Sequence, residues 1–368
     1  MTDQEAYVAF NLTDKVGSVK VAELVASCGG SVVGAWDAWP SKASRAGGDV
    51  DWRDEFARAR HFGVQIVTPA DKDYPATLLD QPSHPLALYV KGDVAVLSTP
   101  SVAIVGTRRA TAYGLDQAFK IAHGLASDGW TVVSGLALGV DAEAHRGALD
   151  AGGKTVGVIG SGLDCFYPEE NRDLAREIVK KGGAVVSEFP FGRQPDQQTF
   201  PQRNHVVAAL ARGVVAVEAP FKSGTLITTS LAADMGRVVM AVPGRVDSRS
   251  SAGCLALLRD GARLVRSAAD VEEELAELIP RQMPRSGAVA PPPTERRQKD
   301  PPRQDAPRFS IEEAIIMREI DEEGVPMDAL IRRTGLPAEK VNALCVSLRL
   351  KGRVRFFPGN RVALPRGK

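Results

Sequence analysis

The sequence predicts an α/β protein built around an open, mostly parallel sheet, with a small helical domain before the sheet and a winged helix after it. Between residues 101 and 279, short apolar runs alternate with amphipathic segments of helical periodicity, a pattern typical of open α/β sheets. The apolar runs are nearly continuous, as expected of strands buried on both faces of a parallel sheet. A proline-rich stretch then separates this region from a second helical segment.

The N-terminal part, residues 1–65, is predicted to form a small helical domain, and its clearest periodic stretch is "VKVAELVASCGG". Residues 66–280 are predicted to form the α/β domain. Its first part, 66–100, contains "DKDYPATLLDQPSHPLALYVKGD". The prolines in this stretch indicate a connector that leads into the sheet.

Seven segments of the α/β domain are predicted to be strands. In chain order they are "SVAIVG" (101–106), "WTVVSG" (130–135), "KTVGVIG" (154–160), "GAVVSE" (183–188), "GVVAVEA" (213–219), "RVVMAVPG" (237–244) and "ARLV" (262–265). Segments such as "AYGLDQAFKIAHGLASDG" lie between them and are predicted to be helices.

The C-terminal part is predicted to be a linker followed by a winged helix. Residues 281–307 contain seven prolines and no aromatic residue, which indicates a proline- and arginine-rich linker without a core. Residues 308–368 return to helical periodicity and end in "RVRFFPGNRVALP". Three short helices followed by a two-stranded wing are typical of a winged-helix domain.

The composition predicts a cytoplasmic protein without an overall positive charge that would attract nucleic acid. The formal net charge is +1, so a nucleic-acid site has to be local. Cysteines stand at 28, 165, 254 and 345, none in a C-x-x-C pair, which favours reduced thiols over a zinc site or disulfides. We expect no signal peptide, because the N-terminus "MTDQEAYVAF" has no basic start and no continuous apolar stretch. We expect no membrane span, because no apolar run approaches about 20 residues.

Glycines and small hydroxyl residues follow the predicted strands repeatedly. In open α/β sheets, ligands bind beyond the carboxyl ends of the strands, where such residues let backbone N–H groups approach an anion. The sequence therefore predicts an anion-binding cleft at this edge. The segments that follow the strands include Gly106-Thr107-Arg108-Arg109, Ser134-Gly135, Gly160-Ser161-Gly162 and Lys222-Ser223-Gly224-Thr225.

Spacing argues against a dinucleotide or nucleoside-triphosphate cofactor. A G-x-G-x-x-G fingerprint that starts at Gly106 requires glycines where the chain has Arg108 and Thr111. The G-K-[ST] element of a Walker motif is absent as well. We therefore expect no cofactor and no metal, and we expect the cations Arg108, Arg203 and Lys222 to converge from three loops on one anionic strand.

Two carboxylates, Asp141 and Glu218, are candidates for catalytic groups. Asp141 and His145 lie four residues apart, but Asp141 follows glycine and valine at a predicted helix start, which favours a helix N-cap with His145 as a packing residue. Glu218 ends a strand and is predicted to be a hydrogen-bond acceptor that faces a loop. No G-x-S-x-G and no paired Cys/His signature is present, so the sequence predicts no catalytic residue.

Long segments of the chain resemble the DNA-processing protein A family, called DprA or Smf. The matching segments include "AIVGTRRATAYG", "VVSGLALGVDAEAHRGAL", "GGKTVGVIGSGLDCFYPEENRDL", "SEFPFGRQPDQQTFPQRNHVVAAL" and "VVAVEAPFKSGTLITTS". They run in family order across residues 74–266. The resemblance implies an extended Rossmann-like domain, a SAM-like domain at the N-terminus and a winged helix at the C-terminus.

The resemblance also implies a function without catalysis. Members of this family bind single-stranded DNA, form dimers, protect incoming DNA and load the RecA recombinase during natural transformation. Where the family often has Arg-Asn-Arg, this chain has His205, which could make one phosphate contact weaker or dependent on pH. The residues expected to contact single-stranded DNA are Gly106, Thr107, Arg108, Arg109, Gly135, Ser161, Gly162, Asn171, Arg203, Asn204, Lys222, Ser223, Gly224 and Thr225.

A homodimer interface is predicted at the end of the α/β domain. The last strand, 262–265, follows an apolar helix and can leave an unpaired edge. The residues assigned to this interface are Leu255, Leu258 and Leu264.

Two other functions remain open at this stage. One is a nucleotide-processing enzyme similar to the cytokinin-activating phosphoribohydrolases, whose loop glutamate performs the chemistry. In this chain the corresponding loop reads "SGTLIT", and Thr228 stands in place of that glutamate. The other is a transcription regulator in which the α/β domain senses a ligand and the winged helix reads duplex DNA.

Overall fold

The computed structural model describes residues 1–40, 49–276, 316–320, 325–338, 340–341, 344–345, 348, 354–357 and 361–363. The chain divides into two compact units, Met1–Ala288 and Val289–Lys368, which are described separately. The predicted linker, 281–307, lies outside the described residues.

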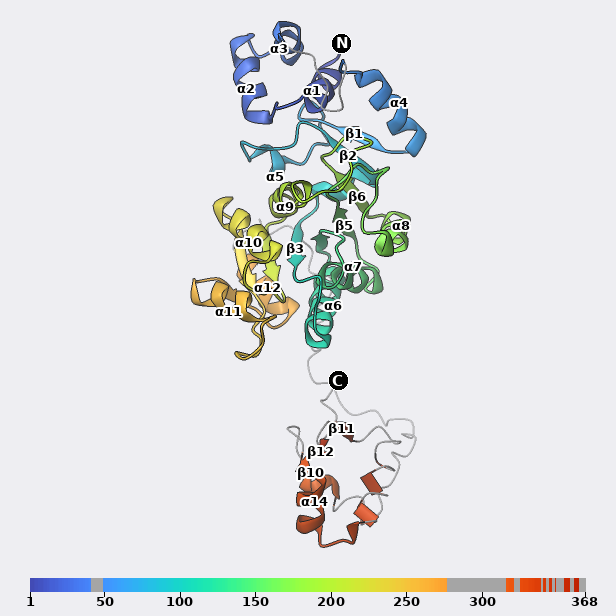
Figure 1. The fold of residues 1–368 in the computed structure, drawn as a ribbon, viewed down its shortest axis with the longest axis vertical. Coiled ribbons are helices and arrows are strands. Elements are labelled where there is room, and N and C mark those ends of the chain that lie inside the picture. The colour runs from blue at the N-terminus through green and yellow to red at the C-terminus, as the bar shows by residue number, and fades with distance from the viewer. Residues whose placement is uncertain are drawn as a thin grey trace, which may run out of the picture. The chain divides into compact units, whose positions relative to one another are not determined.

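The first unit is centred on a nine-stranded sheet with the order β1-β2-β6-β5-β4-β3-β7-β8-β9 (Figure 1). All seven predicted strands are present, and they pair in parallel from β6 to β9. Their bounds are β3 Ser101–Val105, β4 Thr131–Ser134, β5 Thr155–Val158, β6 Ala184–Ser187, β7 Gly213–Ala216, β8 Val238–Ala241 and β9 Arg263–Leu264.

The segment predicted as a connector contributes two strands that the sequence analysis missed. β1 (Gln65–Val67) pairs antiparallel with β2 (Leu88–Gly92), and β2 pairs antiparallel with β6. Pro75, Pro82 and Pro85 lie in the loops on either side of the short helix α5 (Ala76–Leu79), outside both strands. Sequence signals for a loop were therefore correct for the middle of this segment and wrong for its two ends.

Helices cover both faces of the sheet. Helices α6, α7 and α12 pack on one face around residues such as Ile104, Ile121 and Val132, and α8 continues this layer. Helices α9 and α10 pack on the other face around Val105, Val207 and Val214. The bounds are α6 Ala112–Ser127, α7 Val140–Asp150, α8 Arg172–Lys180, α9 Thr199–Leu210, α10 Gly224–Asp234, α11 Ala252–Arg259 and α12 Ala268–Leu275.

The N-terminal region is helical, as predicted. Thr2 caps α1 through a reciprocal capping box with Glu5, and Gly63 ends α4 in the left-handed conformation with φ 59°. Phe10 and Trp36 pack edge to face within this region, while Tyr89 of β2 shares a core with Val8. The helices are α1 Asp3–Leu12, α2 Ser18–Ser27, α3 Val32–Ala38 and α4 Trp52–Phe62.

The second unit has its own core and its own small sheet. Its strands follow the order β10-β12-β11, with β10 at Val325–Pro326, β11 at Arg355–Phe357 and β12 at Arg361–Ala363. Helix α14 (Met327–Thr334) ends at Gly335, which has φ 66°. Leu330, Cys345 and Val362 are fully buried in this core, and the antiparallel pair β11–β12 occupies the position of the predicted wing.

In the described part of the chain, the search for membrane-spanning helices found no single helix of sufficient length and apolarity. One sharply bent pair, α2 with α3, meets the criteria by length and composition alone.

Candidate functional site

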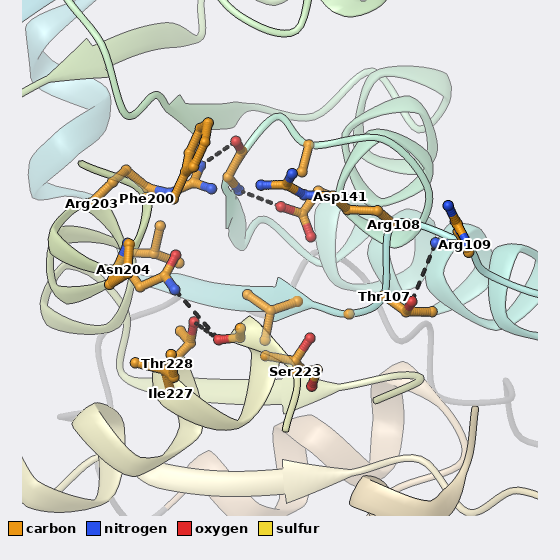
Figure 2. A pocket seen from close by; sticks show the side chains of 18 residues that line it. Thr107, Arg108, Arg109, Asp141, Phe200, Arg203, Asn204, Ser223, Ile227 and Thr228 are labelled. Carbon is orange, nitrogen blue, oxygen red and sulfur yellow. Dashed lines mark hydrogen bonds between the residues drawn. The ribbon is translucent and has the colours of Figure 1, made fainter. Parts of the chain in front are cut away.

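A cleft of about 370 Å³ lies at the carboxyl ends of β3, β4 and β7, where the sequence analysis placed the anion site (Figure 2). It is bounded by the loops after these strands and by the N-terminal ends of α9 and α10. The lining residues are Val105, Gly106, Thr107, Arg108, Arg109, Gly135, Ala137, Asp141, Phe200, Pro201, Arg203, Asn204, Val207, Ser223, Gly224, Thr225, Ile227 and Thr228.

The loop after β3 forms the rim of the cleft. Gly106 is required by packing, because a Cβ at this position would lie 2.5 Å from Cγ2 of Val140. The Thr107 N–H donates to the Glu218 carbonyl at 2.7 Å, and the Arg109 N–H donates to Thr107 Oγ1 at 3.2 Å. These contacts fix the backbone and leave the side chains of Arg108 and Arg109 exposed.

Glu218 holds this loop in place from behind. Its carboxylate accepts hydrogen bonds from Thr111 N at 2.8 Å, Thr111 Oγ1 at 2.7 Å and Ser250 Oγ at 3.1 Å. The side chain is buried, which confirms the predicted role of a loop-facing acceptor. Glu218 therefore fixes the start of α6 and does not line the cleft.

Arg203 forms the floor of the cleft. The expectation that this arginine is free to meet a ligand is wrong. Only 5% of this residue is exposed, and its Nη1 donates to the carbonyls of Gly135 and Val158. A Cβ on residue 135 would collide with the guanidinium, so this position requires glycine. Burial and the neighbouring Arg108 lower the pKa of Arg203 to about 10, against the opposing effect of Asp141.

Asp141 also lies in the floor and is not the helix N-cap that the sequence predicted. The N-cap of α7 is Gly139, and Asp141 Oδ2 accepts from the Gly135 N–H at 3.1 Å. Burial raises the pKa of this carboxyl, while Arg203 and the amides of the loops act to lower it. Asp141 therefore binds backbone amides of the surrounding loops, and it acts on Arg203 through its charge rather than through a hydrogen bond.

His145 is a packing residue, as predicted. It is fully buried one turn beyond Asp141, and its Nδ1 lies 2.6 Å from Thr155 Oγ1. Burial, with Arg203 and Arg146 nearby, lowers the pKa of His145 to about 3. The imidazole is therefore neutral at physiological pH.

Phe200 is the residue of this site that sequence reasoning missed. The guanidinium carbon of Arg108 lies 4.9 Å from the centre of the Phe200 ring, and the Tyr167 ring lies 5.7 Å from it. In Figure 2, Arg108 extends inward toward Phe200, whereas Arg109 points away. The signal was available, because Phe200 stands three residues before Arg203 in "FPQRNH".

The N-terminus of α10 forms the wall opposite the Arg108 loop. Ser223 is the N-cap residue of this eleven-residue helix, and Gly224 and Thr225 form its first turn. Asn204 Nδ2 donates to the Gly224 carbonyl at 3.4 Å and ties α9 to this wall. Unpaired amides at a helix start favour an anion. Lys222 is exposed beside the wall with φ 61°, outside the lining.

Three of the predicted contact residues lie away from the cleft and make structural bonds. The Ser161 carbonyl accepts from Ser187 Oγ at 2.6 Å, and the Gly162 N–H donates to the Arg193 carbonyl at 2.8 Å. Asn171 Nδ2 donates to the Leu136 carbonyl at 2.8 Å. Contact of these three residues with DNA stays a prediction.

His205, in the position of a family arginine, does not reach the cleft. Its Nε2 lies 2.9 Å from Ser83 Oγ, and burial together with His84 lowers its pKa. His205 is therefore neutral at physiological pH, and the expectation of a pH-dependent phosphate contact at this residue finds no support in its position.

The predicted interface leucines differ in exposure. Leu264 is 52% exposed on β9, the strand at one edge of the sheet. Leu255 and Leu258 are half-buried on α11, and Leu258 packs against the cluster around Ala216 and Cys254. Part of this surface is therefore already packed against other residues of the same chain.

Among the described residues, no group of three or more His, Cys, Asp and Glu could hold a metal ion.

Comparison with known proteins gives two family matches. The model of the DNA recombination-mediator protein A family matches residues 65–276, and the model of the DprA winged helix domain matches residues 297–360. Protein Smf of Synechocystis is 42% identical over 207 residues, which make up 55% of this chain and 52% of that protein. The chain therefore matches about half the length of this relative.

Two solved structures support the fold. The X-ray structure of DNA processing protein A from Streptococcus pneumoniae has a TM-score of 0.62 and 33% identity, covering 74% of this chain and 98% of that one. The structure of DNA processing protein A from Helicobacter pylori, reported with its single-stranded DNA binding mode, has a TM-score of 0.52 and 31% identity. It covers 58% of this chain and 96% of that one.

Proposed function

This chain belongs to the DNA recombination-mediator protein A family, and we propose that it binds single-stranded DNA in the cleft between β3 and α10. We further propose that it protects incoming DNA and loads the RecA recombinase during natural transformation. The observation that carries the DNA-binding proposal is the arrangement of Arg108 over the Phe200 ring, beside a rim of backbone amides.

This arrangement suits one nucleotide unit of a flexible strand. Guanidinium groups and amides at a helix N-terminus bind phosphate oxygens, and an aromatic ring stacks on a base. Stacking on Phe200 requires a base that is not paired within a duplex. The cleft therefore fits a single strand that is held mainly through its backbone, which carries no direct sequence information.

The solved relative from Helicobacter pylori supports the same ligand, because its structure concerns single-stranded DNA binding by that protein. A phosphoribohydrolase-like enzyme is less well supported. Thr228, which stands in place of the expected glutamate, is buried and donates to the Gly224 carbonyl at 3.3 Å. Asp141 is the one carboxylate among the lining residues, and it is buried against Arg203.

A homodimer through β9 and α11 belongs to the same proposal. The exposed Leu264 lies on an edge strand, and such edges favour pairing with another chain. Light scattering of a Leu264→Asp variant tests this interface, and a folded monomer is expected. A variant that remains a dimer would contradict it.

The DNA-binding proposal is tested by fluorescence anisotropy with a labelled 20-mer of oligothymidylate, a matched duplex and mononucleotides as competitors. We expect binding to the single strand with weak competition by mononucleotides. Arg108→Ala and Phe200→Ala should each weaken binding at least about tenfold, because each removes a charge-assisted or stacking contact. Phe200→Tyr keeps the ring and serves as the matched control.

Circular dichroism verifies that these variants fold. Arg108→Ala should also flatten the dependence of affinity on salt by about one ion contact. Wild-type affinity and salt slope in a folded Arg108→Ala variant would show that the cleft is not the DNA site. Equal affinity for a mononucleotide would favour the enzyme, and preference for a specific duplex would favour the regulator.

A further inference from the structure

A second pocket, of about 360 Å³, lies between α4 and α8 on the face of the sheet that carries α6 and α7. It shares no lining residue with the cleft. Figure 1 places α8 beside β5 and β6, with α4 beyond the end of the sheet where β1 and β2 lie. The lining residues are Phe62, Val64, Lys91, Leu163, Phe166, Arg172, Ala175, Arg176, Val179, Lys180 and Val185.

The lining of this pocket combines apolar and positively charged side chains. Seven lining residues are apolar and four are cationic, and no carboxylate lies among the eleven. The apolar floor includes Val185 of β6, while Phe62 at the end of α4 is 39% exposed. An apolar pocket of this size fits a small ligand or one or two side chains of a partner.

The cations form a row along the pocket. Arg172, Arg176 and Lys180 follow one another at intervals of four residues on α8, so they lie on one side of the helix over about 12 Å. An extended peptide covers this length with about four residues. A row of charges fits several carboxylates on one chain better than a single anionic head group.

Counter-charges within the chain pair with two of the three cations of this row. Arg172 donates from Nε and Nη2 to the two carboxylate oxygens of Glu169, both at 2.6 Å, and this bidentate geometry is the stronger kind of surface pair. Arg176 makes one bond of 2.7 Å to Asp173, whose side chain is 91% exposed, and such a pair contributes little to stability. Lys180 makes no ion pair with any residue that the structure describes. Arg176 and Lys180 are therefore available to an external anion, whereas a ligand has to compete with Glu169 for Arg172.

We propose that this pocket binds an acidic peptide segment of a partner protein, with one aromatic or large aliphatic side chain in the apolar floor and its carboxylates along Arg172, Arg176 and Lys180. A nucleic acid strand fits less well. A base placed on this floor would leave its polar edge unpaired, because the lining side chains other than the cations offer no hydrogen-bonding group.

The test uses the full chain and a labelled peptide, Asp-Glu-Asp-Asp-Phe-Leu, in fluorescence anisotropy. We expect a dissociation constant on the order of 10–100 μM, typical of a small transient contact, that weakens with salt. Replacing Phe and Leu of the peptide by Ala should abolish binding, as should replacing its acidic residues by Lys.

Variants of the protein locate the site. Arg176→Glu combined with Lys180→Glu should weaken peptide binding at least tenfold. Lys181→Glu is the matched control, because Lys181 is the C-cap residue of the same helix, lies outside the lining and pairs with Glu177 at 3.0 Å. This variant should change affinity less than twofold. Both variants should bind oligothymidylate like the wild type, since the cleft is separate.

Three results would overturn the proposal. The first is the absence of binding by the acidic peptide. If laurate, tested as a small amphiphile, binds in its place, the pocket is a site for a small ligand and not for a peptide. The second is equal binding of the peptide without Phe and Leu. The third is loss of oligothymidylate affinity in the Arg176/Lys180 variant, which would assign the row to DNA.

Discussion

The rim and the floor of the cleft carry the same residue type in opposite environments. At the rim, the side chains of Arg108 and Arg109 are exposed, and the bonds of this loop are made by the backbone. In the floor, Arg203 is 5% exposed and bonds to two carbonyls at the ends of β4 and β5. The difference shows that burial, not residue type, decides whether an arginine is bound within the fold or stays accessible to a ligand.

The floor sets the shape on which the rim depends. Arg203 joins the loop after β4 to the end of β5, and Asp141 joins the same loop to α7. Arg108 then extends over Phe200, which lies on the same helix as Arg203. A change in the floor should therefore act first on stability, and a change at the rim should act first on the ligand.

Arg203→Ala should give the largest effect. It leaves Asp141 buried without the neighbouring positive charge and removes a donor from two buried carbonyls, which should lower the free energy of unfolding by about 3–5 kcal/mol. Urea denaturation followed by circular dichroism measures this change. Unfolding of Arg203→Ala at the wild-type urea midpoint would break the distinction between floor and rim.

The double variant Arg203→Met with Asp141→Asn sharpens the same test. Removing both charges together should cost less than the sum of the two single changes, because neither charge is then left alone in the interior. Additive losses would show that the two residues do not act as a pair.

The parallel part of the sheet could be predicted from the sequence because its strands from β3 to β8 are apolar runs that end at a glycine or a small residue, as in "SVAIVG". β1 and β2 were missed for a physical reason. β1 has three residues, and four prolines lie between β1 and β2. Neither strand gives a local pattern, and the pairing of β2 with β6 depends on contacts distant in sequence.

The site was predicted in its position and only partly in its roles. The loop of Thr107 and the start of α10 lie where strand-end glycines indicated. The burial of Arg203 could not be predicted, because it depends on carbonyls from two strands and on a glycine at 135, which come together only in the folded chain. The missing Cβ of Gly135 was interpreted as space for an anion, whereas a guanidinium fills it.

His145 provides the next test of the floor, through pH. Its pKa is about 3 in the folded chain and about 6.5 in an unfolded one. Because the folded pKa is depressed, the unfolded chain takes up a proton first, and stability is lost as pH falls from about 6.5 toward 3. Between pH 7.5 and 4.5 this loss amounts to roughly 2–3 kcal/mol.

A His145→Gln variant isolates this contribution. Whatever the substitution costs at pH 7.5, the variant should lose roughly 2–3 kcal/mol less than the wild type on going to pH 4.5, since all other groups titrate in both proteins. Urea midpoints at the two pH values give this difference. Parallel pH profiles would mean that His145 is not held neutral beneath the floor.

Lys222 lies just outside the rim, and substitutions there should change stability and DNA affinity less than those in the floor. Its φ of 61° is unfavourable for a residue with a Cβ, so Lys222→Gly should raise the free energy of unfolding by about 0.5–1 kcal/mol. If the lysine contacts phosphate, affinity for oligothymidylate should fall about two- to fivefold with a flatter salt slope. Lys222→Asn is the matched control, because asparagine tolerates a positive φ and carries no charge. A stability gain with an unchanged salt slope would place Lys222 outside the DNA site.

Removal of the second unit should have the smallest effect on single-strand binding. Every lining residue of the cleft lies in Met1–Ala288, and the second unit has a separate core around Leu330 and Val362. A chain truncated after Ile279 should therefore bind oligothymidylate within about twofold of the full chain, because an intact floor and rim are sufficient. The last twenty residues, 349–368, carry seven Lys or Arg and no Asp or Glu, so duplex binding is measured alongside. A loss confined to duplex DNA would assign the winged helix a contact of its own, whereas a large loss of single-strand affinity would show that the main site is not in the cleft.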